Sequence, residues 1–176
     1  TTFIEKLYPY NSSISSYIQK LKSLTSTAKT DNLAITEILY STIDELSRLN
    51  SISRKEADRI PAKKKATRDE LYKRLNIAKD FMSSCYFEEI TLERLAETCY
   101  LNPFYLLREF KKLYRITPHQ YLTKVRLQEA EKMISGSQKQ IMQVLNEVGF
   151  EDAASFAKLF KKQFGVSPTV YRNQSA

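Results

Sequence analysis

The chain has 176 residues, of which 42% are hydrophobic and only 3 are glycine, and its formal net charge at pH 7 is +8. This length provides for one or two modest cores, and the absence of strand-like alternation predicts an all-α fold. We find neither a run of about 18 apolar residues nor a signal-peptide pattern, which argues against membrane insertion and leads us to expect a cytoplasmic protein.

Residues 1–50 contain two stretches with apolar residues at helical spacing. The first stretch includes Ile14, Tyr17, Ile18, Leu21 and Leu24. The second includes Ile35, Ile38, Leu39, Thr42, Ile43, Leu46 and Leu49. Two such helices need a partner surface, which is either each other, the C-terminal part of the chain, or a second copy. We expect the second stretch to be the better candidate for a homodimer interface.

Residues 51–68 are polar and basic, are interrupted by Pro61, and are predicted to be a linker. The lysines at 63–65 either lie along phosphates or are simply solvated. Thr67, with Glu70 three residues later, is expected to cap a helix from Asp69 to about Ser84, which opens a third part of the chain, residues 69–176.

The third part repeats itself at a spacing of about 50 residues. This spacing aligns Leu95 with Leu145, Tyr100 with Phe150, Phe110 with Phe160, Pro118 with Pro168, Tyr121 with Tyr171, and the lysine pair 111–112 with the pair 161–162. Each copy predicts a short helix, a turn, a capping residue (Asn102 or Asp152) and a longer helix ending in lysines. This is the pattern of a helix-turn-helix, at about 92–113 and 141–163.

A long helical stretch with apolar residues at regular spacing joins the copies and ends at Gly136. In a helix-turn-helix the second helix enters the major groove of double-stranded DNA. Two copies on a rigid connector would reach successive major grooves about one helical turn, ~34 Å, apart. The positive charge agrees with a polyanionic partner.

Several motifs in residues 91–172 resemble the AraC family of bacterial transcription regulators. These are L-x-x-L-A at 92–96, R-x-F-K-K at 108–112, T-P-x-x-Y-L at 117–122, R-L-x-x-A at 126–130, E-V-G-F at 147–150 and the long S-F-x-K-x-F-K-K-x-F-G-x-S-P-x-x-Y-R at 155–172. The resemblance implies seven helices, two helix-turn-helix units joined by a central helix, and regulation of transcription, usually activation through RNA polymerase. It also implies an effector-binding domain that this chain lacks, preceding the dimerisation helices and linker.

By position, the resemblance implies that the first unit meets bases with Phe104, Tyr105, Leu107 and Arg108. Arg108 has paired donors for a guanine, whereas Phe104 is either a contact to a thymine methyl or a core residue. Leu107 departs from the polar residue that is common at its position.

In the second unit, the corresponding front carries Ala153, Ala154, Ser155 and Lys158, which offer few hydrogen bonds. We therefore expect the first unit to supply most base specificity and the second to supply mainly phosphate contact and shape fit. The expected phosphate contacts are Asn102, Lys111, Lys112, Asp152, Lys161 and Lys162, although the lysines could also be a solvated helix face.

We expect no catalytic residue, no metal site and no cofactor. Cys85, Cys99 and His119 lack a metal-binding spacing, and both cysteines are expected to be core residues. Two alternatives remain open. One is a DNA-repair enzyme with a reactive cysteine, which apolar surroundings would disfavour. The other is a helical protein–protein interaction module without specific DNA binding.

Overall fold

The computed structural model describes residues 12–25, 32–61 and 64–175. These ranges contain nine α-helices and no β-strand, which confirms the predicted all-α fold. The chain divides into two units, residues 1–73 and 74–176, and the boundary falls inside α3 (Lys65–Ser84). None of the helices described is both long enough and apolar enough to cross a lipid bilayer.

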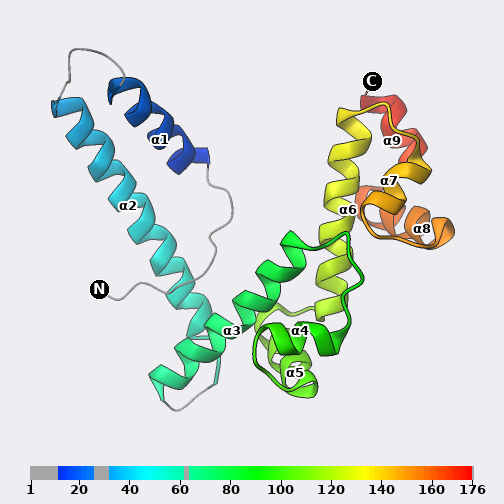
Figure 1. Ribbon diagram of the computed structural model, residues 1–176, viewed down its shortest axis with the longest axis horizontal. Coiled ribbons are helices and arrows are strands. Elements are labelled where there is room, and N and C mark those ends of the chain that lie inside the picture. The colour runs from blue at the N-terminus through cyan, green and yellow to red at the C-terminus, as the bar shows by residue number, and fades with distance from the viewer. Residues whose placement is uncertain (1–11, 26–31, 62–63, 176) are drawn as a thin grey trace. The chain divides into compact units, whose positions relative to one another are not determined.

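In the first unit, α1 (Ser12–Thr25) lies alongside α2 (Asn32–Ala57), as Figure 1 shows. The two apolar stretches of residues 1–50 therefore pack against each other. Ile35, Ile38, Thr42 and Leu49 of α2 are half-buried, whereas Leu39, Ile43 and Leu46 remain exposed.

The segment predicted to be a linker is largely helical, so that prediction was wrong for residues 51–57 and 65–68. α2 continues through Ala57, which is buried together with Ser53 and Ile60. α3 begins at Lys65, so Thr67 lies inside its first turn and is not its cap. Contacts between α2 and α3 stabilise these two helix ends. In one of them, the Tyr72 hydroxyl donates to the Glu56 carboxylate at 2.5 Å. Sequence periodicity does not reveal such contacts.

The second unit consists of the end of α3 followed by six helices: α4 (Leu92–Thr98), α5 (Pro103–Tyr114), α6 (Pro118–Gly136), α7 (Ile141–Glu147), α8 (Ala153–Phe164) and α9 (Pro168–Ser175). In Figure 1, α4 and α5 lie at one end of α6, and α7, α8 and α9 lie at the other. α6 begins with a complete capping box between Thr117 and Gln120. The helices α3 to α9 are the seven that the resemblance implied.

The two copies bury the same aromatic contact. Phe110 of α5 meets Tyr121 of α6 with ring centroids 5.9 Å apart, and Phe160 of α8 meets Tyr171 of α9 at 5.6 Å, both nearly edge-to-face. The spacing of 50 residues therefore holds from α5 and α8 onward. Such aromatic pairs add to the stabilisation from burial alone.

In the first helices of the two copies, the predicted alignment was wrong by one residue. The turn after α4 is closed by Leu101 N–H donating to Ala96 O, and the turn after α7 by Phe150 N–H donating to Leu145 O. Phe150 is thus equivalent to Leu101, and Tyr100 is equivalent to Gly149. Tyr100 and Gly149 both have a positive φ, of 55° and 84° respectively. The second turn contains one additional residue before its capping Asp152, which pattern matching at constant spacing cannot detect.

Arg126 of α6 connects the two helix-turn-helix units. Its guanidinium donates to the carbonyl oxygens of Tyr86 at 2.7 Å and Glu88 at 2.8 Å, in the segment that leads into α4. The same group lies against the turn of the second unit, where a Cβ on Gly149 would come within 3.0 Å of Arg126 Nη2. α6 and Arg126 thus link the two helix-turn-helix units.

Candidate nucleic-acid interface

The first candidate DNA-reading helix, α5, begins at a fully formed N-cap. Asn102 Oδ1 accepts from the backbone N–H of Phe104 at 3.0 Å and of Tyr105 at 3.4 Å, and Pro103 occupies the first helical position. This confirms the capping role predicted for Asn102. α5 is anchored in the domain by the buried side chains of Leu106, Phe110 and Leu113.

Phe104 is 81% exposed at the start of α5. A phenylalanine with this exposure does not belong to the core, so of the two interpretations open from the sequence, the core one is excluded. Tyr105 follows and is also exposed. The outer face of α5 thus begins with two aromatic side chains.

Arg108 lies one turn farther along this face, with its side chain 61% exposed. Its Nε donates to Glu109 Oε1 at 2.8 Å, and its Cζ lies 5.2 Å from the centre of the Tyr105 ring. Glu109 was not identified from the sequence. A comparison of the two copies could have identified it, because this acidic residue stands between Arg108 and Lys111 where the second copy has Leu159.

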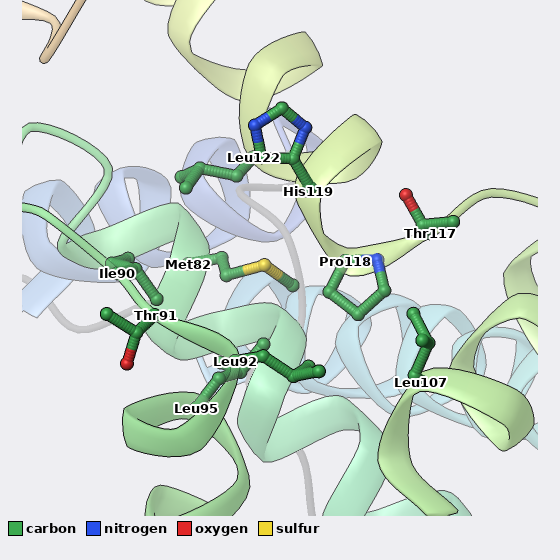
Figure 2. A pocket seen from close by; sticks show the side chains of 10 residues that line it. All are labelled: Met82, Ile90, Thr91, Leu92, Leu95, Leu107, Thr117, Pro118, His119 and Leu122. Carbon is green, nitrogen blue, oxygen red and sulfur yellow. The ribbon is translucent and has the colours of Figure 1, made fainter. Parts of the chain in front are cut away.

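Leu107 lies at the margin of this face. It is half-buried and lines a pocket of about 400 Å³ between α3, α4, α5 and the start of α6, near Pro118, Met82 and Leu92 (Figure 2). The lining is mainly apolar, with Thr91, Thr117 and His119 as its polar members. Leu107 therefore contributes part of its surface to packing.

The second candidate helix, α8, is capped by Asp152, as predicted. The carboxylate accepts from the N–H of Ser155 at 2.7 Å and of Ala154 at 3.4 Å. Hydrogen bonds from the Ser155 side chain and from these backbone groups lower the pKa of Asp152. Phe156 and Phe160 anchor α8 in the core.

The short side chains at the front of α8 are exposed, as is the one basic residue among them. Ala153, Ala154, Ser155 and Lys158 all lie at the surface. Compared with α5, this surface carries no exposed aromatic ring and no guanidinium. It permits close approach to another surface while offering few side-chain donors.

Both candidate helices end with exposed lysines, Lys111 and Lys112 on α5 and Lys161 and Lys162 on α8. Lys112 Nζ pairs with Glu109 Oε1 at 3.0 Å. No ion pair joins the other three lysines to an acidic residue in the described ranges. Cations in the last turn also stabilise the helix itself, because the backbone carbonyls there carry partial negative charge.

Residues 95–174 match the helix-turn-helix domain family. A transcriptional regulator from Chromobacterium violaceum, described as containing an AraC-type DNA-binding domain, has the same fold, with a TM-score of 0.55 and 24% identity over 58% of this chain and 92% of that one. Residues 95–174 form a helix-turn-helix domain with the fold of an AraC-type DNA-binding domain.

The AraC-type domain is also similar to a structure solved with nucleic acid. That structure is the DNA-binding domain of AdpA, the global transcriptional factor, in complex with a target DNA. It is 25% identical, with a TM-score of 0.55 over 57% of this chain and 91% of that one. The bifunctional transcriptional activator/DNA repair enzyme AdaA of Bacillus subtilis is 33% identical over 101 residues, which are 57% of this chain and 48% of AdaA. The chain thus spans about half the length of this curated relative.

Cys99 is not placed like a nucleophile. Cys99 is fully buried in the first helix-turn-helix unit, and its thiol donates to Leu95 O at 3.2 Å. Burial raises the pKa of the Cys99 thiol and so disfavours the reactive thiolate. Cys85 is half-buried, and His119 is exposed in the first turn of α6.

Proposed function

We propose that the protein is a sequence-specific DNA-binding transcription regulator whose helices α5 and α8 enter successive major grooves on one side of the duplex. The observation that carries this proposal is the outer face of α5. An exposed arginine and an exposed phenylalanine stand there on a capped helix within an AraC-type domain. These side chains match the donors and apolar contacts that read base edges.

In this proposal α5 reads bases through Arg108, Phe104 and Tyr105, with Leu107 contributing at its margin. The two Nη groups of Arg108 suit the O6 and N7 acceptors of a guanine, a contact worth about 1–3 kcal/mol of discrimination. Phe104 suits a thymine methyl. The exposure of Phe104 and Arg108 on one helical face supports this assignment.

α8 contributes mainly backbone contact and shape fit. Ala153, Ala154 and Ser155 allow close approach to the groove, and Lys158 adds a cation. We assign phosphate contacts to Lys111, Lys112, Lys161 and Lys162. Asn102 can donate from Nδ2 while its Oδ1 caps α5, whereas Asp152 has no donor and would act only by orienting the first N–H groups of α8.

The length of α6 supports two grooves. With 19 residues at 1.5 Å each, this helix is about 28 Å long, comparable to the ~34 Å between successive major grooves on one side of the duplex. A single chain would then read two short blocks about one helical turn apart, and the block read by α5 would be the better defined.

We further propose that the regulator is an activator that contacts RNA polymerase and forms a homodimer through α2. The activator role is supported by the name of AdaA. The dimer is supported by Leu39, Ile43 and Leu46, an apolar stripe at spacings of four and three residues that α1 leaves exposed. The half-buried Ile35, Ile38, Thr42 and Leu49 would flank this stripe.

Selection of binding sites from random duplexes, followed by affinity against salt, tests DNA recognition. Arg108→Ala should relax preference at one or two base pairs, whereas Lys161→Ala should weaken all duplexes about equally and reduce the salt slope by about one. Arg48→Ala is the matched control. Arg48 is 59% exposed and also pairs with a glutamate, Glu45, but it lies on α2. Failure to enrich any motif would leave a helical interaction module as the better interpretation.

Sedimentation of Ile43→Asp tests the dimer. Ile43 is 55% exposed, so the substitution leaves the packing of α2 on α1 intact while placing a charge in the stripe. Ile52→Asp is the control, because nine residues at 3.6 per turn put Ile52 on the opposite side of α2. We expect only Ile43→Asp to dissociate the dimer. A monomeric unmodified chain would refute the assignment.

A further inference from the structure

Glu109 is a carboxylate with low exposure on the helix that we assign to base reading. It is 7% exposed, on the side of α5 that packs against the domain. Carboxylates are almost never buried unless they are paired. The equivalent residue of α8 is Leu159, which packs against the core cluster of the second unit. An apolar side chain therefore suffices for packing at this position, and the acid on α5 calls for another explanation.

A single oxygen of Glu109 holds two cations. Oε1 accepts from Arg108 Nε at 2.8 Å and from Lys112 Nζ at 3.0 Å. Both partners are more than half exposed, at 61% and 51% of their side chains, so the carboxylate connects the interior of the domain with its outer face. Charge-assisted hydrogen bonds of this kind are stronger than neutral ones.

The bond to Nε determines which donors of Arg108 remain available. With Nε engaged by Glu109, the Nη1 and Nη2 groups are the pair left to meet an external acceptor. These two groups can form the bidentate contact to guanine O6 and N7. The Tyr105 ring, 5.2 Å from the guanidinium carbon, restrains the same group from another side.

The carboxylate also changes the charge balance of the two helices. The outer face of α5 carries three cations, Arg108, Lys111 and Lys112. The carboxylate of Glu109 reduces the net charge of this group by one unit. The corresponding face of α8 carries Lys158, Lys161 and Lys162 with no acid between them. Phosphate binding depends on the number of cations that neutralise phosphates, so Glu109 should lower the attraction of α5 for arbitrary DNA.

We propose that Glu109 is a positioning residue that presents the Nη groups of Arg108 to a guanine and at the same time reduces the affinity of α5 for phosphates of non-target DNA. This inference rests on the proposed DNA-reading function of Arg108. The specific difference from α8 is an acid in place of Leu159.

The test compares Glu109→Gln with Glu129→Gln in the full chain. Glu129 pairs with Lys132 three residues later at 2.6 Å, as Glu109 does with Lys112, but it lies on α6. Affinity is measured for the selected duplex, for the same duplex with the Arg108-dependent base pair replaced, and for random DNA, each over a range of salt.

For Glu109→Gln we expect discrimination at that base pair to fall by about threefold to tenfold, a part of what a bidentate contact confers. Affinity for random DNA should rise, with a salt slope steeper by up to about 0.9. In an Arg108→Ala background, Glu109→Gln should no longer change discrimination, because the two residues act through one contact. Glu129→Gln should alter neither the discrimination nor its dependence on Arg108.

The outcomes separate this inference from the proposed function. If Arg108→Ala itself loses no discrimination, base reading by α5 fails. If Arg108→Ala loses discrimination and Glu109→Gln does not, the positioning role is overturned. Glu109→Leu, which copies the residue of α8, guards against a folding defect. Equal loss of affinity for all duplexes in both Glu109 variants, with lowered unfolding free energy, would assign Glu109 a purely structural role and overturn the inference.

Discussion

Alanine at Gly149 should destabilise the DNA-binding domain more than alanine at Gly165. The two glycines have almost the same backbone conformation, with φ of 84° and 85°. They differ in their surroundings. A Cβ at Gly149 would lie 2.9 Å from the carbonyl oxygen of Phe87 and 3.0 Å from Arg126 Nη2, whereas a Cβ at Gly165 meets no atom within 4 Å.

The magnitudes follow from this difference. Left-handed backbone costs an alanine about 1–2 kcal/mol relative to glycine, and this cost applies at both positions. Gly149→Ala adds an overpacking cost of about 1–3 kcal/mol. The neighbours there cannot move freely, since one is backbone and Arg126 is held by the carbonyls of Tyr86 and Glu88. We therefore expect losses of about 1–2 kcal/mol for Gly165→Ala and about 2–5 kcal/mol for Gly149→Ala.

Urea unfolding followed by circular dichroism measures both free energies of unfolding. Both substitutions are Gly→Ala in the same unit, so the gain from restricting the unfolded chain is common to both and cancels in the difference. Equal losses, or a larger loss for Gly165→Ala, would refute the close approach of Gly149 to Phe87 and Arg126.

Three further predictions concern the turns and caps. Tyr100→Gly should stabilise the domain by up to about 1 kcal/mol in the same urea assay, because Tyr100 is 80% exposed and holds a positive φ where the second unit has glycine; destabilisation would show that its side chain contributes packing. Asn102→Ala should cost about 1 kcal/mol through loss of the cap on α5, and an unchanged midpoint would contradict the capping geometry. The lowered pKa of Asp152 contributes stability that is present above its unfolded pKa of about 3.9 and is lost as pH falls through its folded pKa. Asp152→Asn should therefore weaken the acid dependence of the melting temperature, and an unaltered acid limb would contradict that shift.

The duplicated pattern was legible in the sequence because it depends on local features. Capping residues, apolar spacing at 3.6 residues per turn and a repeated aromatic and lysine order all act within one or two helices. For this reason the all-α fold, the caps Asn102 and Asp152, and the end of α6 at Gly136 could be predicted. The assignment of Arg108 and its neighbours to the outer face of α5 came instead from the family resemblance.

Tertiary structure alone decided the features that depend on contacts between distant residues. The end of α2 at Ala57 is held by contacts with distant residues, such as the hydrogen bond between Tyr72 and Glu56. The equivalence of Tyr100 with Gly149 follows from how each turn closes. The inward side of α5 is occupied by Glu109 because its carboxylate can reach Arg108 and Lys112 from there. Periodicity records which face of a helix is apolar, but only the packed structure shows which polar groups meet across or beside it.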